Sequence, residues 1–310
     1  MKSVKQAHDF SEKKVHELRA RLAEEIPDTL NIVTCGSYAR RDATPSSDLD
    51  YYCVFPKEVG ENGHATTVRE IVLDVIGKAP SAGGAFAQDI TEQDLLSNIG
   101  GFDDSNANIT RRILYLLEGE YLTDEESFER VRKELIQKYV ASTPGDHQIA
   151  FYLLNDIVRY WRTITVDYAH KISAVGPAKP WGVRNLKLVY SRKLIYASGI
   201  FSVALTADRS LDQKQEILEL LFRKTPIERL RYVCGAAATE RLFDIYDHFI
   251  EKMNDSAFRE RMDALRPEDK LENEEFRLLK NEGHYFSREL MSLLQNTFHS
   301  SHPIHMALIF

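Results

Sequence analysis

Residues 30–55, LNIVTCGSYARRDATPSSDLDYYCVF, decide how this chain folds. The runs LNIVTC (30–35) and LDYYCVF (49–55) are short, rich in β-branched and aromatic residues, and bounded by turn-forming residues. Such runs are typical of strands, so we expect two strands with a polar connection between them. The residues in and beside this connection are the ones whose chemistry is unusual.

Two aspartates, Asp48 and Asp50, lie at the start of the second predicted strand. Because successive side chains of a strand point to opposite faces, both carboxylates share one face, with Leu49 and Tyr51 on the other. Two carboxylates held this close repel one another unless a cation lies between them. Mg²⁺ takes hard oxygen ligands and completes its shell with water and substrate phosphates, so we expect Asp48 and Asp50 to bind Mg²⁺, or Mn²⁺ in its place.

The residues that follow the first predicted strand suit a phosphate group. Gly36 lets backbone approach a ligand without a β carbon in the way, and the Ser37 hydroxyl can donate to a phosphate oxygen. Arg40 and Arg41 are expected to supply positive charge at the mouth of the site. Beside two metal-binding aspartates, these residues predict a bound triphosphate that is held for in-line attack at its α-phosphorus.

The string GSYARRDATPSSDLD (36–50) resembles the signature of the DNA polymerase β-type nucleotidyltransferase superfamily, which is Gly-Ser, a spacer and Asp-x-Asp. Its expanded form is similar to a bacterial group of uridylyltransferase-like and related nucleotidyltransferases. The segments LLNDIVRYWRT (153–163) and PWGVRNLKLVYSRKLIY (180–196) resemble the helical part that accompanies such domains in that group. The resemblance therefore covers most of the chain, and its motifs are specific between residues 35 and 55.

The resemblance implies a third carboxylate on a neighbouring strand, which completes the metal site and helps to deprotonate the attacking hydroxyl. Asp89 is the best-placed candidate if residues 85–90 form that strand. The alternative for Asp89 is a solvated cap of the helix that is expected to begin near Thr91.

The rest of the sequence pattern predicts an α+β protein. Helical spacing over residues 3–25 precedes the first strand, and a second helical pattern covers 66–78. Further helical patterns follow at 106–119, 124–141, 147–172, 181–205, 210–222, 226–254 and 284–297. We expect a catalytic domain over residues 1–142, with a small mixed β-sheet and flanking helices. An all-α half over 143–310 would complete the nucleotide and acceptor cleft. The boundary falls at Ser-Thr-Pro-Gly (142–145), although a turn within one body has the same composition.

Basic residues are concentrated in residues 155–193, which contain eight Lys or Arg against two Asp in a chain of net charge −7. Arg184 and Lys187 fall on one stripe of a predicted helix, and we expect them to bind the nucleotide or the acceptor; a solvated helix face is the alternative. For a second stripe that contains Arg159 and Arg162, an ion pair with protein carboxylates and a contact with phosphate are both open.

Several other classes of protein are excluded or disfavoured by the sequence. The chain has no G-x-x-x-x-G-K-[ST] motif and no G-x-G-x-x-G after a strand, which excludes P-loop and Rossmann nucleotide sites. It has no run of about 18 apolar residues and no apolar secretion signal, so we expect no contact with a membrane. Its three cysteines are an odd number without paired spacing, which favours reduced thiols in the cytoplasm.

Three functions remain. The first is an enzyme that moves a nucleoside monophosphate from an NTP, such as ATP, to a protein, RNA or small-molecule acceptor. The second is a synthase of a nucleotide second messenger, because the same site can use another nucleotide as acceptor. The third is a nucleotide-binding regulatory protein with weak catalysis, which the lack of an obvious third carboxylate favours and the intact GSYARRD and DLD strings oppose. Our prediction is the first.

Overall fold

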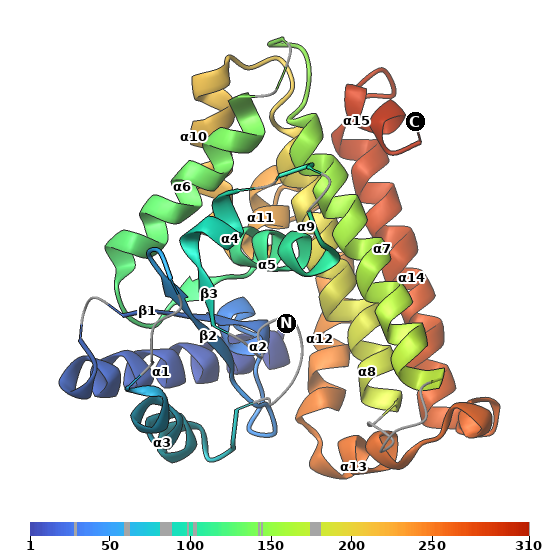
Figure 1. Ribbon diagram of the computed structural model, residues 1–310. Coiled ribbons are helices and arrows are strands. Elements are labelled where there is room, and N and C mark those ends of the chain that lie inside the picture. Colours follow the sequence, from blue (N-terminus) through green and yellow to red (C-terminus); the bar gives the residue numbers. More distant parts are fainter. Residues whose placement is uncertain are drawn as a thin grey trace. The chain divides into compact units, whose positions relative to one another are not determined.

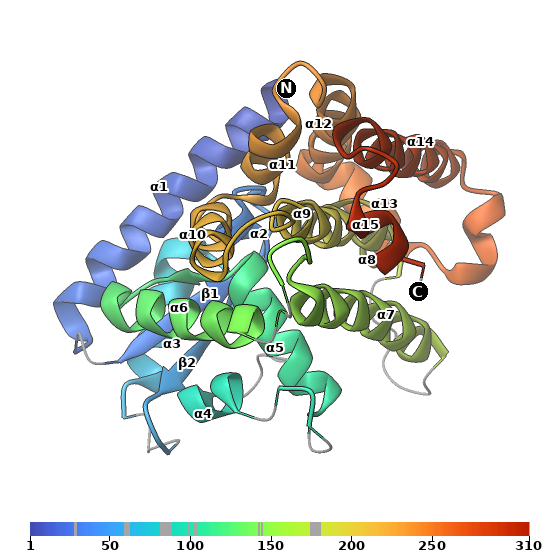
Figure 2. The ribbon, with the colours of Figure 1, turned by 90° about the horizontal axis from the view of Figure 1, so that it is seen from above.

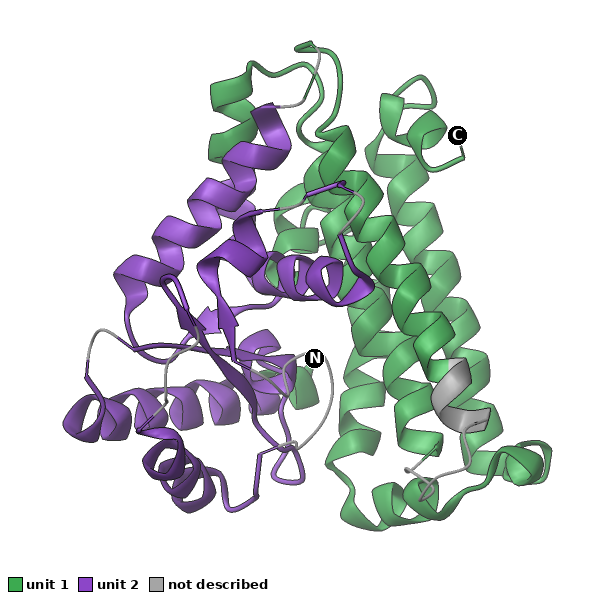
Figure 3. Ribbon diagram, viewed as in Figure 1, with its two compact units in different colours: residues 1–5, 143–217, 226–310 green, residues 6–142, 218–225 purple. Residues whose placement is uncertain are grey.

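The computed structural model describes residues 1–27, 30–58, 63–80, 89–97, 99–101, 104–141, 143, 145–173 and 181–309. These residues form two compact units (Figure 3). The sheet unit comprises Gln6–Ser142 and Leu218–Thr225, and the helical unit comprises Met1–Lys5, Thr143–Ile217 and Pro226–Phe310. Of the four residues at the predicted domain boundary, 142 and 144 lie outside the described residues.

The sheet unit is built on four strands in the order β3-β2-β1-β4 (Figure 1). The strands are β1 (Asn31–Cys35), β2 (Asp50–Phe55), β3 (Ile90–Thr91) and β4 (Glu120–Tyr121). β1 pairs in antiparallel fashion with both β2 and β4, whereas β3 runs parallel to β2. The sheet is therefore mixed, as we expected, and the two strands predicted at 30–35 and 49–55 are its central pair.

Two helices, α1 (Lys2–Glu25) and α3 (Ala65–Ile76), cover one face of this sheet (Figure 1). Their buried apolar residues form one core with Ile32, Leu49 and Cys53 of the sheet side. The buried positions on the two helices include Val15, Leu18, Leu22, Val68, Ile71, Val72 and Val75. This spacing of three and four residues is the pattern that predicted both helices.

Three more helices complete the sheet unit: α4 (Glu92–Leu96), α5 (Asn106–Leu117) and α6 (Glu125–Ala141). α5 and α6 pack together through Tyr115, whose buried hydroxyl donates to the Phe128 carbonyl at 3.0 Å. α4 begins at a capping box, in which Thr91 and Asp94 satisfy each other's backbone N–H groups. The N-cap of this helix is thus Thr91 and not Asp89, whose alternative role as a helix cap is wrong.

The helical unit contains no strand in its described residues, and the predicted α+β class with an all-α second half is confirmed. Its elements are α7 (Phe151–Ser173), α8 (Gly182–Lys187), the π-helical turn η1 (Leu188–Arg192), α9 (Lys193–Ala204), α10 (Leu211–Phe222), α11 (Pro226–Cys234), α12 (Glu240–Asn254), α13 (Ser256–Ala264), the 3₁₀ turn η2 (Pro267–Leu271), α14 (Glu274–Thr297) and α15 (Pro303–Ala307). α10 continues from this unit into the sheet unit. α9 is buried along nearly its whole length, between α7 and α11 (Figure 2).

Three predicted helix boundaries differ from the structure. The helix expected over 226–254 is divided at Gly235, which has φ +87 and ends α11 before α12 begins. The helix expected at 284–297 begins ten residues earlier, where Asn273 caps α14 by accepting from the Phe276 N–H at 2.8 Å. Residues 181–205 form α8 and α9 with a π-helical turn between them, which the 3.6-residue periodicity does not reveal.

None of the described helices is both long enough and apolar enough to span a bilayer.

Candidate active site

Gly36 lies at the end of β1 and starts the short helix α2 (Gly36–Arg40). Its φ is +76, a conformation that residues with a β carbon rarely adopt. A β carbon built on Gly36 would also lie 2.6 Å from Oδ2 of Asp50, which is too close for any real contact. Glycine is thus required twice here, by the backbone conformation and by the carboxylate packed against it.

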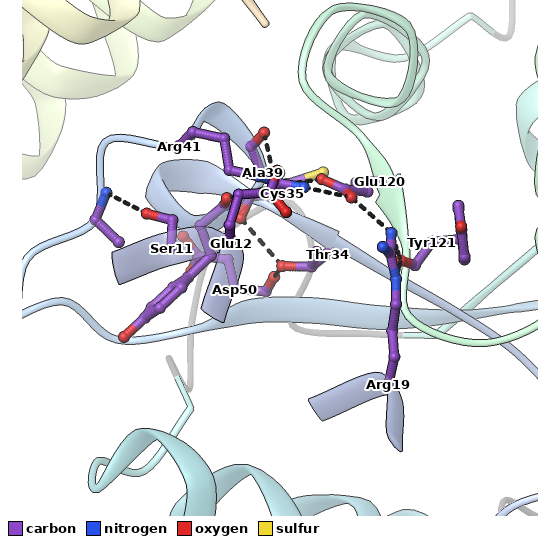
Figure 4. Close-up of polar contacts among 12 residues, drawn as sticks. Ser11, Glu12, Arg19, Thr34, Cys35, Ala39, Arg41, Asp50, Glu120 and Tyr121 are labelled. Carbon is purple, nitrogen blue, oxygen red and sulfur yellow. Dashed lines mark hydrogen bonds and ion pairs between the residues drawn. The ribbon is translucent and has the colours of Figure 1, made fainter. Parts of the chain in front are cut away.

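The pairing of β1 with β2 fixes the position of Asp50. Cys35 is the register partner of Asp50, and the neighbouring Thr34 hydroxyl donates to the Asp50 carbonyl at 2.8 Å (Figure 4). The last residue of one strand and the first residue of the next are therefore held side by side. This places the Gly36 turn and the Asp50 carboxylate together without any contribution from a ligand.

The alternation expected for Asp48 and Asp50 is present. Leu49 is fully buried in the core beneath the sheet, whereas Asp48 is exposed and Asp50 is half-buried. β2 starts at Asp50, so Asp48 lies just before the strand. This burial pattern is the one expected if Leu49 points into the core and both aspartates point away from it, as two metal ligands would.

The Asp48 carboxylate lies near the buried side chain of Tyr38 on α2. Burial, and then the negative charge of Asp48, raise the pKa of Tyr38 to about 12. The Tyr38 hydroxyl consequently stays protonated at neutral pH. The negative charge of Asp48 thus acts on the Tyr38 hydroxyl in the helix that begins at Gly36.

Ser37 has an available hydroxyl. The residue is half-buried, its carbonyl accepts from the Asp42 N–H at 2.9 Å, and its side chain makes no hydrogen bond with any residue that the structure describes. The backbone of Ser37 is therefore fixed while its hydroxyl can donate to a ligand. These are the properties expected of a phosphate contact.

The Cys35 thiol lies between two carboxylates on the same face of the sheet. Burial, and then the charges of Glu118 and Asp50, raise the pKa of Cys35 well above its usual range. Glu118 directly follows α5 and precedes β4, so it approaches β1 from the strand opposite to Asp50. Cys35 is consequently a neutral thiol beneath the candidate site.

Arg40 is buried in the frame of the site, where we had expected it at the mouth. Its guanidinium donates to both oxygens of Asp42 at 3.0 Å and to Glu118 at 2.7 Å. The side chain is only 9% exposed. The Nε, Nη1 and Nη2 atoms thus each donate to one of these two carboxylates, so the side chain turns inward toward Glu118 rather than outward to solvent.

Arg41 is also buried and ties three elements together. It has φ +64, and its guanidinium donates to the Tyr38 carbonyl at 2.8 Å at the end of α2. The same group bonds to Glu12 of α1 at 2.6 Å and to both oxygens of Glu120 in β4 (Figure 4). Arg19 of α1 shares Glu120, so a network of buried charge holds the turn from behind.

The spacer between the two motifs is likewise held by protein contacts that the sequence did not indicate. The Ala43 N–H donates to the Ser11 hydroxyl of α1 at 3.2 Å, and the Thr44 N–H donates to the Ser47 hydroxyl at 3.0 Å. All four residues are buried. The spacer thus positions Asp48 as a closed loop rather than as a free connection.

Asp89 directly precedes β3, and its Oδ1 accepts from the Cys53 N–H at 2.9 Å. Because Ile90 is the parallel partner of Val54, Asp89 is level with Cys53, three residues along β2 from Asp50. Three residues of a strand span about 10 Å. The structure therefore does not bring Asp89 together with the Asp48–Asp50 pair, and residues 85–88 of its expected strand lie outside the described residues. Its role as third carboxylate stays a prediction.

Residues 15–137 match the family model of the nucleotidyltransferase domain. The chain carries a nucleotidyltransferase domain. The match begins within α1 and ends within α6, so it includes all four strands and the whole 36–50 motif. It agrees with the resemblance to the DNA polymerase β-type superfamily. Neither the curated proteins nor the solved structures gave a match.

The residues of the nucleotidyltransferase domain fit a Mg²⁺ ion that keeps several water molecules in its coordination shell. In the described chain, no group of three or more His, Cys, Asp or Glu residues is arranged to hold a metal ion. Mg²⁺ is usually bound by one or two carboxylates, with water and substrate phosphates at its other positions. Asp48 is exposed and Asp50 is half-buried, and Gly36, the residue before Ser37, lies against the Asp50 carboxylate.

The other predicted binding residues, Arg184 and Lys187, lie on α8 in the helical unit and not in the nucleotidyltransferase domain. Both side chains are partly buried. Of the second basic stripe, Arg159 pairs with Asp156 at 3.1 Å, which favours the ion-pair alternative, and Arg162 is exposed. Binding by Arg184 and Lys187 stays a prediction.

Proposed function

We propose that this protein is a metal-dependent nucleotidyltransferase, which moves a nucleoside monophosphate from an NTP such as ATP to a hydroxyl or amine of a protein, an RNA or a small molecule. The observation that carries the proposal is the contact of Gly36 with the Asp50 carboxylate, with the exposed Asp48 two residues earlier in the chain. A glycine turn packed against one of two closely spaced aspartates serves a metal-bound phosphate better than it serves folding, because neighbouring carboxylates are costly without a cation.

Each residue of the site has a defined part in this proposal. Asp48 and Asp50 hold Mg²⁺ or Mn²⁺, which supplies Lewis-acid stabilisation of the phosphate charge when it is bound. The Ser37 hydroxyl and the backbone beside Gly36 orient the phosphates for in-line attack. Arg40 and Arg41 hold the turn through Glu118, Asp42, Glu12 and Glu120 and do not contact the nucleotide.

The test is transfer of label from each of the four α-³²P NTPs, with Mg²⁺ or Mn²⁺ and a cell lysate as the source of acceptor. Label on protein, on RNA or in a small molecule identifies the acceptor class, and labelled dinucleotides or cyclic products would identify a messenger synthase instead. Binding is measured separately as the rise in melting temperature with NTP and Mg²⁺, which a chelator should remove. If no NTP binds at millimolar concentration with either metal, the proposal is wrong.

A second candidate, a nucleotide-binding protein with little turnover, is favoured by the position of Asp89. The Cys53 N–H occupies one oxygen of Asp89, about 10 Å along the strand from Asp50, so the candidate general base is not at the pair. This function predicts a metal-dependent rise in melting temperature with no transfer of label. The two measurements together separate it from the enzyme.

We also propose a cytoplasmic location. All three cysteines are free thiols, with Cys35 and Cys53 buried and Cys234 half-buried, which fits a reducing compartment. Thiol quantification in protein purified without reductant tests this proposal; an intermolecular disulfide through Cys234 in the cell would contradict it.

A further inference from the structure

In the helical unit, α14 crosses the π-helical turn η1 at very close range. A β carbon on Gly283 of α14 would lie 2.3 Å from Cγ1 of Val189, so only glycine leaves room for the Val189 side chain at this crossing. π-helical turns inside α-helices are rare and occur frequently at functional sites. This crossing brings side chains of α8, α9 and α14 together on both sides of Gly283.

Two lysines lie on either side of the crossing. The Lys193 ammonium, at the start of α9, donates to the Ser287 hydroxyl at 2.7 Å, four residues after Gly283. The Lys280 ammonium, three residues before Gly283, donates to the side-chain carbonyl of Asn185 on α8. Both lysines thus bond to a neutral partner across the interface between the two helical segments.

Neither ammonium is paired with a carboxylate among the residues that the structure describes. The nearby Glu282 of α14 is bound to His248 at 2.7 Å. Burial lowers the pKa of Lys193. Burial, and then the charges of Lys193 and Lys270, lower the pKa of Lys280. Two like charges have therefore been partly removed from water without compensation, which is costly to the fold.

The surroundings of the two lysines hold the partner of Lys280 in place and add further positive charge. Asn185 donates through its Nδ2 to the Tyr168 hydroxyl at 2.8 Å, and this bond fixes the amide so that its oxygen faces Lys280. The charges of Arg192 and Arg184 reach the Tyr168 hydroxyl. The cluster is consequently cationic over parts of three helices, and an anion would relieve the repulsion within it.

We propose that Lys193 and Lys280 together form a binding site for a phosphate group on the helical unit. Two ammonium groups match the charge and the several oxygens of a phosphate better than those of one carboxylate. The inference rests on the proposed function for its ligand, which is one of the two reactants: the triphosphate of the NTP or a phosphate carried by the acceptor.

The test is calorimetric titration of the full-length protein with inorganic tripolyphosphate in the presence of a chelator, so that metal-dependent binding at Asp48 and Asp50 does not contribute. We expect Lys193→Met and Lys280→Met each to weaken binding at least about tenfold. Lys5→Met, which removes the same charge from an exposed position in the same unit, should leave the affinity unchanged. Unchanged affinity in both lysine variants would overturn the site.

A second variant guards against misfolding of the first two. Asn185→Asp keeps the size of the side chain but places a carboxylate beside Lys280, which should compete with phosphate and weaken tripolyphosphate binding by a similar factor. Without ligand, its melting temperature should rise, because the buried ammonium gains a counter-ion. Normal tripolyphosphate affinity in this folded variant would contradict the proposal.

The two sources of phosphate are separated by adding Mg²⁺ and a saturating α,β-methylene NTP analogue. If the lysines bind the nucleotide triphosphate, the analogue excludes tripolyphosphate; if they bind the acceptor, tripolyphosphate still binds to the nucleotide-saturated protein. Asp48→Ala should retain tripolyphosphate binding in chelator. Lysine-dependent binding without any nucleotidyl transfer would sustain this site while overturning the proposed function.

Discussion

Gly36 and Asp50 are packed so closely that a β carbon on the first would lie 2.6 Å from a carboxylate oxygen of the second. The turn after β1 and the start of β2 therefore pack directly against one another. Any side chain added at Gly36 would displace the Asp50 carboxylate. The same contact places the proposed phosphate-binding turn beside the proposed metal ligand. A substitution that adds a side chain at Gly36 should therefore affect both folding and transfer.

The first prediction compares Gly36→Ala with Gly77→Ala. Gly77 has nearly the same conformation, φ +77 against +76, but a β carbon there meets no atom within 4 Å. Gly77→Ala should therefore cost only the conformational term, about 1–2 kcal/mol of unfolding free energy in urea. Gly36→Ala should cost clearly more and should abolish transfer, because Asp50 must move.

A double-mutant cycle tests the cause of the extra cost. In an Asp50→Ala background the carboxylate is gone, so Gly36→Ala should cost no more than Gly77→Ala does. Equal costs for the two glycine substitutions in the wild-type background would show that the contact with Asp50 does not matter.

The second prediction concerns the metal ligands. Asp48→Ala and Asp50→Ala should each abolish transfer of α-labelled nucleotide while the fold is retained, because each removes a metal-binding carboxylate. In chelator, their melting temperatures should hold or rise, since carboxylate repulsion is relieved. Asp9→Ala, at an exposed position of α1, is the control for loss of one acidic side chain. Full transfer activity in Asp48→Ala or Asp50→Ala would show that these residues do not form the active site.

The central strand pair and its glycine and acidic residues could be predicted from sequence because they depend on local rules. Alternation alone predicts Asp48 and Asp50 on the face opposite to the buried Leu49. Gly36 directly follows the β-branched run of β1 and marks the end of that strand. Helix breaks were harder to predict: the division at Gly235 depends on a positive φ, and the π-helical turn before Lys193 changes the periodicity itself.

The contacts of the two arginines could not be predicted, because their partners are distant in the sequence. Arg40 and Glu118 are 78 residues apart, and Arg41 and Glu120 are 79 apart. From the sequence alone, an Arg-Arg pair beside a phosphate-binding motif is as compatible with contact to a ligand as with ion pairs to protein carboxylates. The sequence does not show which carboxylates fold against the pair. Only the pairing of β4 with β1 brings those glutamates to the turn.

The third prediction tests whether Arg40 is structural. Arg40→Met leaves Asp42 and Glu118 buried and without their cation, so unfolding free energy should fall by about 3–5 kcal/mol. Arg130→Met, which breaks the pairs of a 45% exposed arginine with Glu134 and Glu92, should cost clearly less than Arg40→Met. A phosphate contact would give the opposite result for Arg40: weakened nucleotide binding with little change in the urea midpoint.

The fourth prediction is a pH dependence caused by Tyr38. Its pKa is about 12 in the folded chain and near 10 when exposed, so between these values only the unfolded state loses the proton. Stability should therefore fall as pH rises from about 10 to about 12, by up to about 3 kcal/mol from this residue. Tyr38→Phe should make the loss of stability over this window less steep in urea titrations; an unchanged slope would contradict the burial of the Tyr38 hydroxyl, which is the main cause of its raised pKa.

The last prediction concerns Arg184 and Lys187 on α8. If they bind the phosphates of the nucleotide or acceptor, Arg184→Ala and Lys187→Ala should weaken binding and cost little stability, because a partly exposed helix charge contributes little to folding. If they form structural ion pairs instead, unfolding free energy should fall by about 3–5 kcal/mol while the folded protein binds normally.

Salt dependence decides between these two roles for Lys187. A contact with phosphate makes binding by the wild type more sensitive to salt than binding by Lys187→Ala, because salt screens the attraction that the variant lacks. Affinity is measured at two salt concentrations for both proteins and for Lys138→Ala, which removes an exposed lysine of α6. Lys138→Ala should follow the wild type at both concentrations, so that net charge alone does not explain a difference. If Lys187→Ala also follows the wild type in affinity and in salt dependence, Lys187 does not bind phosphate.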